Sequence, residues 1–154
     1  ALREAQFQSL QIPHTGMAIT IDIGEWNDLH PDNKKDVGLR LALLAKKIAY
    51  KENIVASGPL FKSVAITGNS MRLSFTNTGS GLFTNNGQPP VSFAIAGADK
   101  KFVWANARIE GDAIILSVPG ISDPKFVRYA WADNPIINLY NKEGLPAAPF
   151  RTDK

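Results

Sequence analysis

The sequence predicts an α/β unit over residues 1–53, followed by an all-β, sandwich-like unit over residues 54–154. Helical periodicity occurs only in the first region, where it surrounds one apolar run of strand length. The second region is a series of short strand-like runs that recur at roughly 8 to 12 residues and are separated by turn residues. Such a series is typical of a sandwich or a barrel.

The first region is predicted to form a helix, a strand, a loop and a second helix. Residues 2–6 are good helix formers, and a proline and a glycine follow them. Residues 17–23 are almost uniformly apolar between two glycines, which predicts a strand buried on both faces, as in a parallel sheet. Beyond a polar loop, Asp32 or Asn33 can cap a helix. The apolar stripe of that helix comprises Val37, Leu41, Leu44, Ala45 and Ile48.

The second region is predicted to consist of strands joined by tight turns. Gly68 and Asn69 have the composition of a two-residue hairpin turn. Residues 134–154 contain three prolines and are expected to form an ordered loop. The expected strands are residues 63–67, 71–75, 91–96, 102–105, 107–110, 113–118 and 126–131.

Composition excludes several classes of function. The net charge is only +3, and the basic residues form at most separated pairs, so we expect no nucleic-acid partner. No apolar run approaches the roughly 20 residues of a membrane span, so we expect no membrane partner. The chain has no cysteine and two histidines, and it lacks a phosphate-binding glycine motif. We therefore expect neither a metal nor a cofactor.

Asp28 and His30 are the strongest candidates for chemistry, because they follow the predicted strand directly. Functional groups gather beyond the carboxyl ends of strands in open α/β sheets. A carboxylate two residues before a histidine can orient the imidazole while the imidazole accepts a serine proton. The competing interpretation is that His30 only caps or packs the loop. His14 lies in a turn at the opposite end of the predicted strand, which indicates a structural role.

No serine in the chain has the context of a nucleophile. A nucleophile elbow needs a strand, a turn and a helix, whereas Ser70 follows a predicted hairpin turn and Ser80 lies in a glycine-flanked loop. The chain therefore offers a base and its acid without their serine. Aromatic residues in the β region either stack on sugar rings or fill the core. They are Trp104, Tyr129, Trp131, Tyr140 and Phe150.

Several long segments resemble the C-terminal part of bacterial sialate O-acetylesterases. The resemblance is strongest in residues 128–135 (RYAWADNP) and 138–146 (NLYNKEGLP). It also covers residues 2–6, 15–24, 27–31, 36–43, 57–63 and 150–153, and so spans nearly the whole chain.

That family belongs to the SGNH hydrolases, serine esterases with a flavodoxin-like α/β core. The resemblance implies that His30 is the general base and Asp28 its acid. The usual pattern of the superfamily is Asp-x-x-His, whereas Asn27 stands three residues before His30 here, so Asp22 or a backbone carbonyl are alternatives for the acid. The family's nucleophilic serine, and the glycine and asparagine of its oxyanion hole, lie upstream of the segments that match.

The resemblance also implies partners and a reaction. The substrate would be an O-acetylated sialic acid or a related acetylated sugar, and the upstream part of the same enzyme would supply the serine. The chain begins with alanine and is expected to be part of a longer or cleaved enzyme, inactive alone, periplasmic or secreted. The alternative is a non-catalytic β-sandwich module that binds carbohydrate or another protein.

Overall fold

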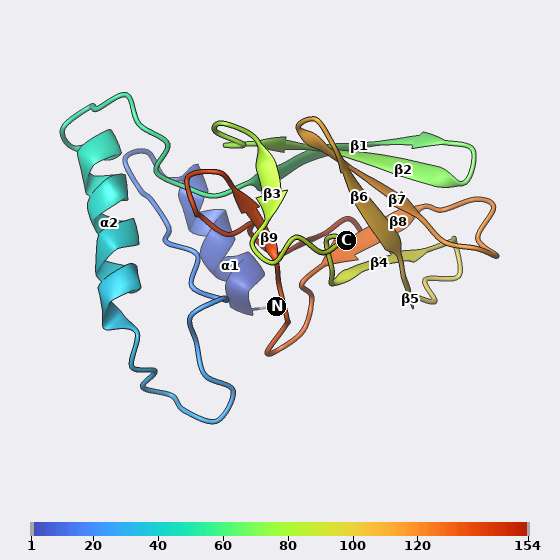
Figure 1. Cartoon of the computed structure of the whole chain (residues 1–154), viewed down its shortest axis with the longest axis horizontal. Coiled ribbons are helices and arrows are strands. Elements are labelled where there is room, and N and C mark those ends of the chain that lie inside the picture. Colours follow the sequence, from blue (N-terminus) through green and yellow to red (C-terminus); the bar gives the residue numbers. More distant parts are fainter. Residues whose placement is uncertain (1, 154) are drawn as a thin grey trace.

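The helices of this chain precede its strands. The computed structural model describes residues 2–153 (Figure 1). Helix α1 (Leu2–Gln8) continues into a single 3₁₀ turn, η1 (Ser9–Gln11), and α2 (Lys34–Ile48) follows a long irregular segment. Both predicted helices are confirmed. Of the two candidate caps, Asn33 is the one used, because its side-chain oxygen accepts a hydrogen bond from the Asp36 backbone N–H at 3.1 Å.

Residues 17–23 do not form the predicted strand. The segment is irregular and ends in a turn, in which the Ile23 N–H donates to the Thr20 carbonyl at 3.2 Å. A strand exists only where a neighbour receives its hydrogen bonds, and none of the described strands runs beside this segment. All strand pairs in residues 2–153 are antiparallel. The parallel sheet of an α/β core is therefore absent from the described residues.

The strands form two four-stranded antiparallel sheets and one two-stranded sheet. In the first sheet the order is β1 (Leu60–Thr67), β2 (Ser70–Thr76), β7 (Ala113–Ser117) and β6 (Asn106–Glu110). In the second it is β10 (Phe150–Arg151), β8 (Phe126–Tyr129), β4 (Phe93–Ala96) and β5 (Val103–Trp104). Strands β3 (Leu82–Thr84) and β9 (Leu139–Asn141) pair with each other.

The core lies between the two larger sheets, so the predicted sandwich-like unit is confirmed. Alternate residues of β2, β4, β7 and β8 contribute to this core, as the two-residue period of a strand requires. Each fully buried aliphatic or aromatic side chain contributes roughly 1.5–3 kcal/mol relative to exposure. The inward residues of β2 and β7 are Met71, Leu73, Phe75, Ile114 and Leu116, and those of β4 and β8 are Phe93, Ile95, Val127 and Tyr129.

The C-terminal segment is more regular than the ordered loop that the sequence predicts. It contributes β9 and β10, and a buried asparagine holds it against the preceding chain. The Asn141 amide nitrogen donates to the carbonyls of Ser57 at 3.1 Å and Asn77 at 3.0 Å, and its oxygen accepts from the Leu145 N–H at 2.9 Å. Strands β3, β9 and β10, of two or three residues each, are too short to show a period in the sequence.

Helix α2 lies at the end of the molecule away from the sandwich, with α1 between them (Figure 1). Its predicted apolar stripe is only partly covered, since Leu41 is 51% exposed and the neighbouring Leu39 is 53% exposed. The residue of α2 that is buried is Arg40. Within residues 2–153, no helix has the length and hydrophobicity that a membrane crossing requires.

Candidate functional site

The loop that carries Asp28 and His30 joins residue 23 to α2 and is held by its own polar groups. One Asp28 carboxylate oxygen, Oδ1, accepts a hydrogen bond from the His30 backbone N–H at 2.7 Å. A Glu25 carboxylate oxygen accepts from the Asp32 N–H at 3.1 Å. Side chains of aspartate often stabilise turns in this way, because they bond to an N–H two residues ahead. The loop is therefore fixed locally, at an exposed position.

The structure brings Asp28 and His30 into one turn but does not join the carboxylate to the imidazole. His30 is exposed, and its ring makes no hydrogen bond with any residue from 2 to 153. Its neighbours Leu29, 90% exposed, and Trp26, 81% exposed, are among the most exposed apolar side chains described. The pairing of Asp28 with His30 as acid and base stays a prediction.

Asp22, the alternative acid, is already bound to another partner. Its two carboxylate oxygens accept hydrogen bonds of 2.6 Å each from the two terminal nitrogens of Arg40. The Tyr140 hydroxyl donates to the same carboxylate at 3.2 Å. Exposure is only 8% for the Asp22 side chain and 10% for that of Arg40. Asp22 therefore joins the base of the loop to α2 and to β9.

Burial and charge shift the pKa values of this cluster. The hydrogen bond to Asp22 raises the pKa of the Arg40 guanidinium, against the effect of burial. Burial, and then the Asp22 charge, raise the pKa of the Tyr140 hydroxyl to about 12. Tyr140 is therefore a neutral hydrogen-bond donor at neutral pH.

Sequence reasoning missed Arg40 and Tyr140. It assigned no functional role to Arg40, and it left open whether Tyr140 stacks on a sugar ring or fills the core. The one signal in the sequence is Asp22 itself, a single charge within an apolar run. A charge in that position needs a partner of opposite sign, but the sequence does not say which basic residue supplies it. Arg40 also donates to the Ile19 carbonyl at 2.5 Å, and so holds residues 19 and 22 together.

Neither candidate serine lies in a catalytic arrangement. Ser70 begins β2, directly after the two-residue hairpin turn that the sequence predicts, and pairs with Thr67. The Ser80 hydroxyl donates to a Glu143 carboxylate oxygen at 2.6 Å, and the Ser80 N–H donates to the same oxygen at 2.8 Å. Within the described chain no serine is hydrogen-bonded to a histidine. His14 lies in an exposed turn with a positive φ of 64°.

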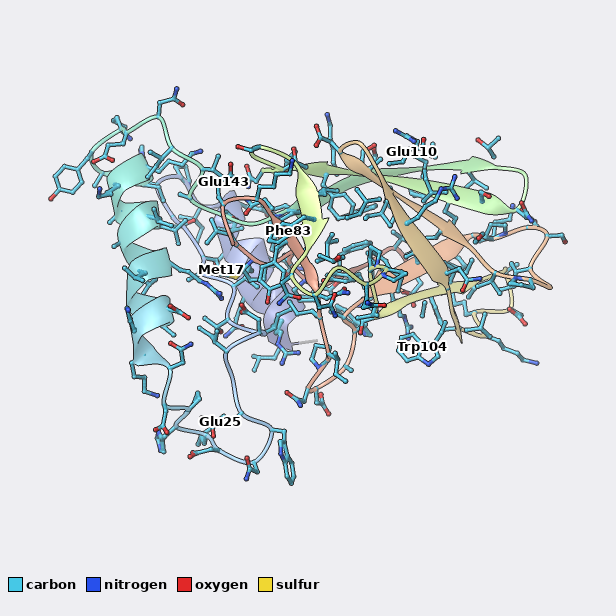
Figure 2. The ribbon with its side chains drawn as sticks, in the orientation of Figure 1. Met17, Glu25, Phe83, Trp104, Glu110 and Glu143 are labelled. Carbon is cyan, nitrogen blue, oxygen red and sulfur yellow. The ribbon has the colours of Figure 1, made fainter. Side chains whose placement is uncertain are left out.

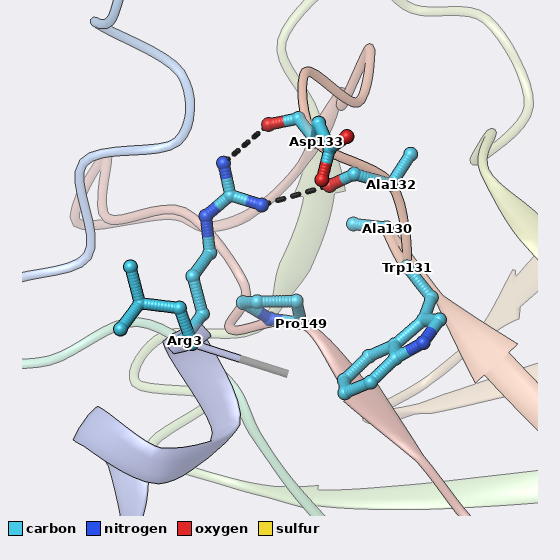
Figure 3. Close-up of a pocket in the computed structure, with 7 residues that line it drawn as sticks. Arg3, Ala130, Trp131, Ala132, Asp133 and Pro149 are labelled. Carbon is cyan, nitrogen blue, oxygen red and sulfur yellow. Dashed lines mark hydrogen bonds between the residues drawn. The ribbon is translucent and has the colours of Figure 1, made fainter.

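Two hollows lie beside α1. One, of about 460 Å³, runs along residues 16–21 between α1 and Pro149. The other, of about 250 Å³, lies between Leu2 and the chain that follows β8. Figure 3 shows the Arg3 side chain extending past Pro149 to donate to the carbonyls of Ala132 at 2.8 Å and Asp133 at 2.6 Å. These bonds fix α1 to the sandwich.

The described residues offer no ligand set for a metal. Among residues 2–153, no group of three or more histidine, cysteine, aspartate or glutamate side chains could hold an ion. The charged groups of the candidate loop are separated from the exposed aromatic of β5, since Glu25 and Trp104 lie well apart in Figure 2.

Comparison with known proteins finds a likeness among solved structures. No family model matches the chain, and no curated protein matches it. A solved structure does match, that of a novel carbohydrate acetylesterase from Xanthomonas citri, with a TM-score of 0.96 and 46% sequence identity. The match covers 99% of this chain and 36% of the other. The chain thus spans about a third of the length of the protein it resembles.

Proposed function

We propose that this chain forms the C-terminal part of a carbohydrate acetylesterase and supplies that enzyme's catalytic histidine, His30. The observation that carries the proposal is the likeness, at 46% identity over 99% of the chain, to part of a carbohydrate acetylesterase. The exposed imidazole on a loop held by its own carboxylates supports the choice of His30.

The reaction would be acyl transfer. A serine of the upstream part attacks the acetyl carbonyl of the sugar ester, and His30 takes the proton of that serine. His30 then gives the proton to the sugar oxygen as its bond to the acetyl carbon breaks, so that the sugar leaves with a free hydroxyl and an acetyl-serine remains. Water attacks that ester with His30 again as the base, and the products are acetate and the free serine. O-acetylated sialic acid is the substrate that the family resemblance favours.

Asp28 would stabilise the imidazolium that forms. Its Oδ1 accepts the His30 N–H, while Oδ2 makes no hydrogen bond within the described residues. The Oδ2 atom is thus available to the imidazole once upstream residues cover the loop. Most of residues 17–23 are only partly buried, and Leu39 and Leu41 of α2 are about half exposed, which supports a place for this region at the edge of an SGNH hydrolase core.

The test uses the longer enzyme that contains this chain, with acetate release as the measurement. His30→Ala should lower kcat by a factor of about 1,000 or more with little change in KM, because proton transfer is needed in the transition state and not for binding. Asp28→Asn should lower kcat by a smaller factor than His30→Ala does. His14→Ala, the matched histidine control, should leave kcat unchanged.

Two results would contradict the proposal. Near-normal turnover in His30→Ala would show that His30 is not the base. A fluorophosphonate label on Ser70 or Ser80 would place the nucleophile in this chain and not upstream. The rates of acetate release from 9-O-acetylated sialic acid and from acetylated neutral sugars then show which sugar the enzyme prefers. If the longer protein deacetylates none of them, the alternative of a non-catalytic module gains support.

A further inference from the structure

The outer face of the second sheet carries a row of side chains that the strand register fixes. Arg128 of β8 lies opposite Ala94 of β4, and Ala94 lies opposite Trp104 of β5. Directly opposed residues of antiparallel strands point to the same face. The alternate residues Phe93, Ile95, Val127 and Tyr129 are buried in the core, so this row faces outward.

The small side chain in the middle of the row leaves a hollow. Ala94 lies between the large side chains of Trp104 and Arg128, and the resulting pocket has a volume of about 240 Å³. Trp131, directly beyond β8, lines the same pocket. Trp104 and Trp131 thus line one pocket, although 27 positions separate them in the sequence. Figure 2 shows the Trp104 side chain pointing away from the sheet.

Trp104 is unusually exposed for its size. It lies on a two-residue edge strand and is 75% exposed. An indole has a large apolar face, which most folded proteins bury at least in part. By contrast Tyr129 and Tyr140, which the sequence grouped with Trp104, are buried. An exposed aromatic face beside a small pocket is typical of a binding surface.

The polar group of the pocket is held in place and its charge is balanced. Arg128 donates to the two carboxylate oxygens of Asp153 at 3.0 and 2.5 Å, and its guanidinium lies 3.9 Å from the centre of the Phe102 ring. Its Nη1 atom makes no hydrogen bond within residues 2–153. Because Asp153 neutralises Arg128, the pocket favours a neutral ligand with hydroxyl groups.

Trp131 is also fixed before any ligand binds. The Arg151 guanidinium lies 5.0 Å from the centre of the Trp131 ring, within the range of a cation–π contact. Arg151 is held in turn by two hydrogen bonds to Glu4 of α1, at 3.1 and 3.0 Å. A fixed aromatic side chain loses little conformational entropy on binding, which favours affinity.

We propose that this pocket binds a neutral pyranose ring of a glycan chain, with Trp104 and Trp131 as stacking surfaces and Arg128 as hydroxyl donor. A pyranose with equatorial substituents presents a flat face of C–H groups, which packs against the negative face of an indole. The proposal rests on the proposed function in one respect: it makes the substrate of the esterase an acetylated oligosaccharide or polysaccharide, held through sugar rings in addition to the acetylated one.

The binding test uses this chain and four soluble polysaccharides: glucomannan and xylan, each in its acetylated and its deacetylated form. Affinity electrophoresis measures the retardation of the protein by each. We expect the chain to be retarded by at least one deacetylated polysaccharide. Trp104→Ala and Ala94→Leu should each weaken that retardation about tenfold or more, the first by removing a stacking surface and the second by filling the pocket.

Tyr50→Ala is the matched control, because Tyr50 is 76% exposed and lies outside this pocket. It should bind as the unaltered chain does. Unfolding midpoints of all variants show whether a loss of binding is a loss of fold. Absence of retardation by all four polysaccharides would overturn the proposal. So would retained binding in both Trp104→Ala and Ala94→Leu.

Catalysis separates this proposal from the proposed function. In the longer enzyme, Trp104→Ala should raise KM for an acetylated polysaccharide and leave 4-nitrophenyl acetate hydrolysis unchanged. His30→Ala should abolish deacetylation and leave polysaccharide binding intact. Binding by this chain without any deacetylation by the longer protein would refute the esterase and keep the sugar site. Deacetylation by the longer protein, without polysaccharide binding that depends on Trp104, would refute the sugar site and keep the esterase.

Discussion

Asp22 and Arg40 form the best-buried ion pair of the described chain, with two parallel hydrogen bonds of 2.6 Å. The pair joins an irregular segment to a helix, and Tyr140 extends it to β9. Because residues 17–23 have no strand beside them, this pair and the Arg40 bond to Ile19 fix the segment that leads to Asp28 and His30.

Asp22→Asn should lower the free energy of unfolding by about 3 kcal/mol, because it leaves the Arg40 charge buried without its partner. Urea unfolding followed by circular dichroism measures it. Glu110→Gln, which breaks the exposed pair with Arg72, should cost less than about 1 kcal/mol. An equal loss of unfolding free energy in the two variants would show that the buried Asp22 pair stabilises the chain no more than the exposed pair does.

Gly58→Ala should destabilise the chain by about 1–3 kcal/mol, because an added Cβ would lie 2.0 Å from the Pro146 carbonyl oxygen. That oxygen belongs to the backbone of a buried segment and cannot swing aside as a side chain can. Gly38→Ala is the opposite control. A Cβ at Gly38, inside α2, would meet no atom within 4 Å, and alanine is the better helix former, so stability should rise by up to about 1 kcal/mol. Thermal unfolding of both variants shows whether stability falls in Gly58→Ala and rises in Gly38→Ala. Unchanged stability in Gly58→Ala would contradict the close approach of Gly58 to the Pro146 carbonyl.

Asp153 should make the stability of the chain depend on acid pH. Its hydrogen bonds to Arg128 hold the pKa of this buried carboxyl below its ordinary value, which is about 3.9 in an unfolded chain. A pKa lowered by folding contributes stability that is fully present above the unfolded value, and that is lost as the pH falls through the folded value. The unfolding free energy at pH 6 should therefore exceed that at pH 2.5 by a larger margin in the unaltered chain than in Asp153→Asn. Equal margins would show that Asp153 does not contribute to the dependence.

The candidate loop was predictable in part. Asp28 and His30 are two positions apart in the sequence, so any fold keeps them close together. The direction of their side chains was not predictable, because the Asp28 carboxylate can accept a hydrogen bond from either the His30 backbone N–H or the imidazole. In the structure it accepts from the backbone N–H. That Trp104 and Trp131 line the same pocket could not be predicted from the sequence, for another reason. It depends on the order β8, β4, β5 in the sheet, and strand order is a property of the whole fold.

The sequence by itself determined both helices, the hairpin turn at Gly68 and Asn69 and most of the longer strands, because cap, turn and period are local properties of the chain. Only the tertiary structure decided which apolar segments have a neighbour. Residues 17–23 have the composition of a buried strand and are not one here, because a strand is stabilised by hydrogen bonds to another strand. Tertiary structure also decides which aromatic residues are buried. Other parts of the chain cover Tyr129 and Tyr140, whereas Trp104 lies on a face that nothing in the described chain covers.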